Sequence, residues 1–135
     1  MIDLVYLMTK IFLVMIGGSL GALCRYSVAL LAAKYIGSRF PWGTLLANMA
    51  GCFLIGFAFA LADRTNYLSP SARLFFMTGF LGAMTTFSTY ALETVNSIRS
   101  GTNPAAITNF IVNNLGGVIL VVAGMWLVQW ILRGE

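Results

Sequence analysis

Long apolar segments alternate with short polar segments along this chain of 135 residues. The apolar segments lie at residues 11–33, 42–62, 74–98 and 105–132, and each reaches or exceeds the roughly 20 residues that a helix needs to cross a bilayer. The segments between them are short and carry most of the charge. The pattern predicts an all-α integral membrane protein, in which four transmembrane helices form a single domain over residues 1–135.

The third apolar segment departs from a plain hydrophobic helix near its middle. Residues 79–93 read GFLGAMTTFSTYALE, in which two glycines are followed by four hydroxyl residues. Glycine and threonine weaken a helix, and a bilayer tolerates non-helical backbone only where protein or a wet cavity surrounds it. We expect the third helix to be broken at residues 82–86, with carbonyls turned inward as ligands for a hard cation. The alternative is an unbroken helix that crosses a neighbour closely.

The remainder of the third segment divides at helical spacing into two neighbouring stripes. One stripe is aromatic and holds Phe87 and Tyr90, whereas the other is polar and holds Thr86, Thr89 and Glu93. Packing against lipid requires neither the hydroxyls nor the acid. This half of the segment is therefore the candidate functional region.

Polar side chains at helical spacing continue the polar stripe in the second and fourth segments. They are Thr44, Asn48, Asn109 and Asn113. A single asparagine such as Asn48 is explained more readily by a hydrogen bond to another helix than by a ligand. Three asparagines within six residues of the fourth segment are harder to explain in that way, so we expect a continuous polar path. Asn114 falls on another face, where packing or a dimer contact would account for it.

The first segment contains a helix-packing signal and an intramembrane charge. Gly17 and Gly21, like Gly18 and Ala22, are small residues four apart that allow another helix to come close. Arg25 lies too deep in the segment to be a loop residue. It is either a functional group or a side chain that extends to the headgroups or to the terminal carbonyls of a neighbouring helix.

The composition agrees with a membrane protein. Hydrophobic residues make up 59% of the chain and charged residues 9%, which no ordinary soluble domain shows. There is no histidine, and the two cysteines, Cys24 and Cys52, lie inside apolar segments. We therefore expect neither a disulfide framework nor a histidine or cysteine metal site. No nucleotide motif is present, and we do not expect an enzyme.

The net charge of +4 does not indicate a nucleic-acid partner, because the basic residues are spread along the chain. With Arg25 set aside, seven basic residues divide four to three between the two sides of the membrane. Orientation follows the difference in positive charge between the sides, and here the difference is nearly zero. A chain that inserts both ways can form an antiparallel two-fold homodimer.

The polar path offers mainly N–H and O–H donors and a single acid, Glu93. Such a lining suits a small anion, whereas a cation path would show more carboxylates or an ordered set of carbonyls. The aromatic pair fits an anion as well, because the rim of an aromatic ring is partly positive. We expect the smallest and hardest anion to be favoured, since closely spaced donors can solvate it fully.

Three stretches, GFLGAMTTFSTYALET, WGTLLANMAGCFLIG and GGSLGALCRY, resemble the signature stretches of the Fluc (CrcB) fluoride channel family. The resemblance covers essentially the whole chain and is weakest in the fourth segment. It implies a fluoride-selective channel that lets fluoride leave the cytoplasm passively and so reduces its toxicity. It also implies an antiparallel dual-topology homodimer in the lipid of the inner membrane, with two pores and a structural sodium ion at the dimer centre.

The resemblance further implies a set of fluoride-pore residues. They would be Thr44, Asn48, Phe87, Ser88, Thr89, Tyr90, Glu93, Asn109 and Asn113. The main-chain carbonyls of Gly82 and Thr85 would hold the sodium ion. The family commonly has phenylalanine at the position of Tyr90, so the Tyr90 hydroxyl either donates to the ion or points away, and the usual phenylalanine favours the second. Hydroxyl residues also occur in the family where this chain has Asn109 and Asn113.

Two other functions fit a short apolar chain less well. Proton-coupled exporters of the small multidrug type are expected to use a carboxylate in the first span. In this chain the first segment holds Arg25 and no acid, and the only intramembrane acid is Glu93 in the third segment. An anchor subunit of a respiratory complex commonly holds haem through histidine, which this chain lacks.

Overall fold

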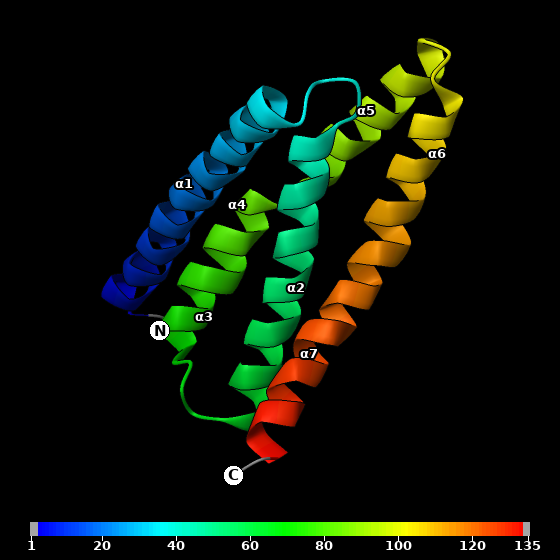
Figure 1. Cartoon of the computed structure of the whole chain (residues 1–135). Helices are drawn as coiled ribbons and strands as arrows, with labels where there is room; N and C mark the ends of the chain where they lie inside the picture. Colours follow the sequence, from blue (N-terminus) through cyan, green and yellow to red (C-terminus); the bar gives the residue numbers. More distant parts are fainter. Residues whose placement is uncertain (1–2, 134–135) are drawn as a thin grey trace.

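A computed structural model of the chain describes residues 3–133, and all regular secondary structure over that range is helical (Figure 1). The elements are α1 (Leu4–Tyr35), α2 (Trp42–Arg64), α3 (Pro70–Arg73), η1 (Leu74–Leu81), α4 (Gly82–Met84), α5 (Phe87–Arg99), α6 (Asn103–Ile111), η2 (Val112–Gly116) and α7 (Gly117–Arg133). The two η elements are π-helical turns. Each continues directly from the helix before it into the helix after it, so α3 to α4 and α6 to α7 form two longer helices.

Three continuous helices are long and apolar enough to cross a membrane, within the part of the chain that the structure describes. They are Leu4–Tyr35, Trp42–Arg64 and Asn103–Arg133. The chain is therefore a multi-pass membrane protein. The predicted third segment, residues 74–98, is divided among η1, α4 and α5, and none of these pieces alone has the length of a span.

The third segment changes neighbours along its length. Its first part, η1 and α4, packs against α1, whereas α5 packs against α6 (Figure 1). Helix α2 contacts α1, α4, α5 and α7, so it lies at the centre of the arrangement. The place where the third segment leaves α1 for α6 is the place where its helix is interrupted, which brings residues from three segments together there.

Glycines allow the closest helix crossings. A Cβ atom on Gly17 or Gly21 would overlap the carbonyl oxygens of Phe75 and Phe80, so α1 and η1 can touch only without those side chains. This confirms the packing role predicted for the pair Gly17 and Gly21. Gly18 faces more open space, since its Cβ would lie 3.9 Å from the nearest atom. The α2–α7 crossing depends in the same way on Gly56 and Gly124.

The loop between α2 and α3 is held by local hydrogen bonds. The Ser69 hydroxyl accepts from the N–H of Ala72 and so caps the helix that Pro70 opens. The guanidinium of Arg73 donates to the carbonyls of Ala62 and Leu68. These bonds fix the direction in which the third segment enters the bundle.

Candidate functional site

The third segment loses helical geometry for two residues. Helix α4 ends at Met84, and α5 begins at Phe87. Between them Thr85 (φ −88°, ψ 153°) and Thr86 (φ −150°, ψ 119°) have extended backbone. Gly82 stays helical, so the extended residues are the two β-branched threonines rather than the glycine. The extended residues lie at the end of the range 82–86 in which the sequence pattern placed the break.

Asn48 of α2 holds the extended backbone in place. Its Oδ1 accepts from the N–H of Thr86 at 2.8 Å, and its Nδ2 donates to the Thr86 carbonyl at 3.1 Å. One buried side-chain amide therefore satisfies both backbone groups of Thr86, as a neighbouring β-strand would. The Thr86 hydroxyl accepts from the N–H of Thr89 at 3.2 Å and caps α5.

The three asparagines of the predicted polar path form one chain of hydrogen bonds. Asn48 Nδ2 donates to Asn113 Oδ1 at 2.8 Å, and Asn113 Nδ2 donates to Asn109 Oδ1 at 2.8 Å. Asn109 is fully buried and donates to the Thr94 hydroxyl at 2.9 Å. The structure thus brings these residues together as predicted. Their amides are bonded mainly to one another, so few of their N–H groups remain free for an ion.

The prediction that Asn114 lies on a different helix face from Asn109 and Asn113, away from the site, is wrong. Its Nδ2 donates to the Tyr90 hydroxyl oxygen at 2.8 Å and to the Phe110 carbonyl at 2.7 Å. The physical reason is the π-helical turn Val112–Gly116, which has more residues per turn than an α-helix and so reduces the angle between neighbouring side chains. Asn113 and Asn114 therefore both reach the site. A pattern based on 3.6 residues per turn does not reveal this.

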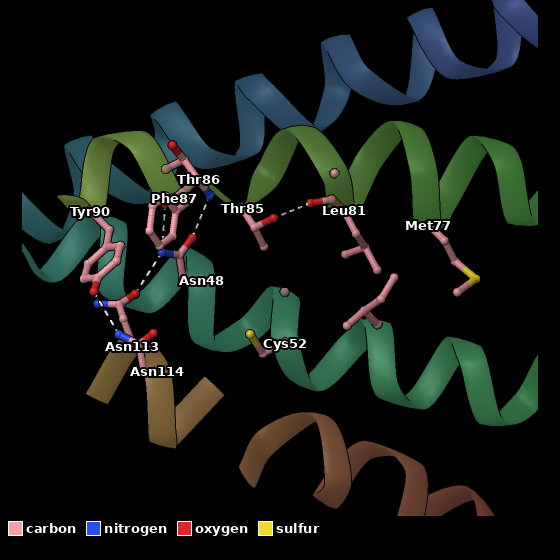
Figure 2. Close-up of a pocket in the computed structure, with 13 residues that line it drawn as sticks. Asn48, Cys52, Met77, Leu81, Thr85, Thr86, Phe87, Tyr90, Asn113 and Asn114 are labelled. Carbon is pink, nitrogen blue, oxygen red and sulfur yellow. Dashed lines mark hydrogen bonds between the residues drawn. The ribbon is translucent and has the colours of Figure 1, made fainter. Parts of the chain in front are cut away.

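A cavity of about 310 Å³ lies beside the interruption, between α2, the third segment and η2 (Figure 2). The residues that line it are Asn48, Gly51, Cys52, Ile55, Met77, Leu81, Gly82, Thr85, Thr86, Phe87, Tyr90, Asn113 and Asn114. Tyr90 is buried, whereas Phe87 has 75% of its surface exposed. Their ring centroids are 5.3 Å apart with an interplanar angle of 69°, so one ring presents its edge to the other.

Five of the predicted pore residues lie outside this lining: Asn109, described above, and Thr44, Ser88, Thr89 and Glu93. Thr44 donates from its hydroxyl to Glu93 Oε1 at 2.7 Å, and Glu93 Oε2 is buried with no hydrogen-bond partner among the described residues. Thr44 lies one turn before Asn48 on α2, so this pair continues along the same face. The Thr86 hydroxyl oxygen lies 3.0 Å from the Thr89 hydroxyl oxygen and 3.3 Å from the Ser88 hydroxyl oxygen, both within hydrogen-bonding distance. Ser88 is exposed.

The interruption frees the two carbonyls that were predicted to bind sodium. In a continuous helix the N–H of Thr86 would bond to the carbonyl of Gly82, and the N–H of Thr89 to that of Thr85. Here these N–H groups donate to Asn48 Oδ1 and to the Thr86 hydroxyl instead. Oxygen ligands are what a hard cation prefers. No group of three or more histidine, cysteine or acidic side chains that could hold a metal occurs within residues 3–133.

Arg25 of α1 lies beside the same interruption. Its Nε donates to the carbonyl of Ala83 at 3.1 Å, near the end of α4. The sequence left open whether Arg25 is a functional group or a side chain that reaches the headgroups or a helix-terminal carbonyl. The structure shows a hydrogen bond to a carbonyl near a helix end. This hydrogen bond supplies a donor to a carbonyl near the end of α4, and it links α1 to α4.

Comparison with known proteins gives a consistent result. Residues 12–125 match the family described as CrcB-like protein, Camphor Resistance (CrcB). The chain is 43% identical over 127 residues to the fluoride-specific ion channel FluC of Salinibacter ruber. This match covers 94% of this chain and 95% of that protein. The FluC proteins of Legionella pneumophila strain Lens and Clostridium perfringens strain 13 are 44% and 39% identical over 122 and 125 residues. Each match covers 90% of this chain, and it covers 91% and 98% of those two proteins.

Proposed function

The chain belongs to the CrcB family, and on that premise we propose that it is a fluoride-selective channel through which fluoride leaves the cytoplasm passively. The observation that carries the proposal is the similarity to proteins named fluoride-specific ion channel over nine-tenths or more of the chain. The cavity at the helix interruption supports it, because amides, hydroxyls and an aromatic pair line it and no acidic side chain does.

Passive transport is sufficient for export. Hydrogen fluoride is a weak acid that crosses a membrane uncharged and dissociates inside, and a negative-inside potential then drives the anion out. The channel needs no nucleotide, and its action reduces fluoride toxicity. We place it in the inner membrane of the cell, surrounded by lipid.

The working unit in this proposal is an antiparallel homodimer with two pores. The near-equal division of positive charge supports insertion in both orientations. The exposure of Phe87, 75% in the single chain, supports it as well, because an aromatic residue at the rim of the cavity is left without a neighbour on one side. A second chain would cover that side and complete the lining of the pore.

A structural sodium ion at the dimer centre is part of the same proposal. The carbonyls of Gly82 and Thr85 have lost their helical donors and would supply two oxygens from each chain. Two chains related by a two-fold axis would supply four, which one chain alone does not offer. The ion would join the two interruptions across the axis and stabilise the assembly.

The variant Gly82→Val tests the dimer centre. Within the chain, the nearest atom to a Cβ on Gly82 is the Met77 carbonyl oxygen at 3.8 Å, so valine fits in the protomer itself. We expect it to prevent dimer formation by separating the two carbonyl pairs. Thr85→Ser keeps the hydroxyl that bonds to the Leu81 carbonyl and should behave as wild type. Size-exclusion chromatography with sodium present measures the result, and a fully dimeric, active Gly82→Val would exclude the proposed centre.

Fluoride efflux from liposomes tests the function directly. Purified protein is reconstituted into vesicles loaded with potassium fluoride or potassium chloride, and a potassium ionophore removes the opposing potential. We expect rapid fluoride release that depends on the protein, with chloride release at the level of empty vesicles. Equal release of the two anions would contradict the proposed selectivity.

A further inference from the structure

The donors that face the cavity are almost all used within the protein. Asn48 has two amide protons, and they go to the carbonyl of Thr86 and to Oδ1 of Asn113. The two amide protons of Asn114 go to the Phe110 carbonyl and the Tyr90 hydroxyl oxygen. The amide of Asn113 is directed at Asn109. An anion that enters the cavity therefore needs a donor other than these amides.

The Tyr90 hydroxyl is such a donor. A phenol has one proton to donate and two lone pairs. One lone pair accepts from Asn114 at 2.8 Å, and no hydrogen bond from the Tyr90 hydroxyl to an acceptor occurs among the described residues. Tyr90 lines the cavity and is only 5% exposed, so its proton has little access to bulk solvent. A buried donor without an acceptor is costly, which favours a guest that accepts a hydrogen bond.

Asn114 also determines how this hydroxyl can act. Because the amide donates to the phenol oxygen, that side of the hydroxyl serves as an acceptor and its proton must point elsewhere (Figure 2). A hydroxyl that accepts one hydrogen bond becomes a better donor in the next. The edge-to-face contact with Phe87 fixes the ring from another side.

We propose that the Tyr90 hydroxyl donates its proton to the anion in the cavity and that Asn114 is the positioning residue that directs it there. The inference rests on the proposed function, with fluoride as the anion. A charge-assisted O–H···F⁻ hydrogen bond is short and strong, and it suits a small, hard anion better than a large one. This replaces the expectation, drawn from the phenylalanine common in the family, that the hydroxyl points away.

Reconstituted Tyr90→Phe tests the proposal through the fluoride concentration that gives half-maximal current. We expect this concentration to rise about tenfold, as the loss of one such hydrogen bond implies. The fold should persist, because only one oxygen is removed and Asn114 keeps its bond to Phe110. Tyr26→Phe is the matched control, since Tyr26 is 62% exposed on α1 and does not line the cavity.

Asn114→Leu separates positioning from packing. It should raise the half-maximal fluoride concentration when Tyr90 is present and add little in the Tyr90→Phe background, because both changes remove the same donor. An unchanged concentration in Tyr90→Phe would overturn the donor role. Additive effects of the two changes would overturn the role of Asn114. Wild type that does not conduct fluoride would instead disprove the proposed function, so the two failures are distinguishable.

Discussion

Replacing Asn48 with aspartate should abolish fluoride flux and reduce the yield of folded protein. The carboxylate can still accept from the N–H of Thr86, but it cannot donate to the Thr86 carbonyl or to Oδ1 of Asn113. Two buried acceptors then lose their donor, and each such loss costs about 1–3 kcal/mol. Together these losses are a large part of the roughly 5–15 kcal/mol that stabilises a typical folded domain.

The effect on flux has a second cause. Asn48 fixes the extended backbone of Thr86, and the Thr86 hydroxyl caps α5, which carries Phe87 and Tyr90. Without the amide, the aromatic pair loses its fixed position beside the cavity. A carboxylate at the wall of the cavity would also repel an anion.

Two measurements separate these effects for Asn48→Asp. Size-exclusion chromatography gives the folded fraction, and fluoride efflux is then expressed per folded dimer. Asn103→Asp is the control, because Asn103 is an exposed asparagine at the start of α6. We expect the control to match wild type in both measurements. If Asn48→Asp folds and conducts normally, the interruption does not depend on the donors of Asn48.

The hydrophobic pattern was sufficient to predict the three continuous membrane-spanning helices, because burial in lipid imposes both length and composition on them. The predicted segment 42–62 corresponds to helix Trp42–Arg64, and 105–132 corresponds to Asn103–Arg133. The first helix extends further than predicted, over Leu4–Tyr35. Polar residues at the ends of helices can be accommodated at the membrane surface, so hydropathy alone underestimates helix length.

The details of the site depend on contacts between segments, which local patterns do not contain. The extended backbone at Thr86 is satisfied by Asn48, which is 38 residues away in the sequence. Helix propensity indicated residues 82–86, a glycine and two threonines among them, whereas the tertiary partner determined that the threonines are the extended residues. Asn114 was assigned to another face because the π-helical turn that redirects it has no clear sequence signal.

The aromatic pair was recognised from its spacing, but its surroundings could not be. Phe87 and Tyr90 are three residues apart on α5, yet one is 75% exposed and the other 5% exposed in the single chain. The difference arises because Tyr90 faces α2 and η2 while Phe87 lies at the open rim of the cavity. Helical periodicity predicts which residues share a face, and it says less about what covers that face.

Phe87→Ile should lower fluoride flux by up to about tenfold while leaving the protomer folded. The ring edge carries partial positive charge that can stabilise an anion, and an isoleucine of similar bulk has no such edge. Aromatic edge interactions are worth about 0.5–1.5 kcal/mol each, and a loss of about 1.4 kcal/mol from the transition state for permeation corresponds to a factor of ten in rate. Because Phe87 is 75% exposed in the protomer, the substitution removes little buried contact within the chain.

The alternative is that the Phe87 ring only packs against a second chain, in which case Phe87→Ile would weaken the dimer and leave flux per dimer unchanged. Fluoride efflux is therefore measured per reconstituted dimer, with the dimeric fraction determined by size exclusion. Phe12→Ile is the matched control, since Phe12 is 52% exposed on α1 and lies outside the cavity lining. Normal flux per dimer in Phe87→Ile would refute the ring-edge mechanism, and a loss confined to that variant would support it.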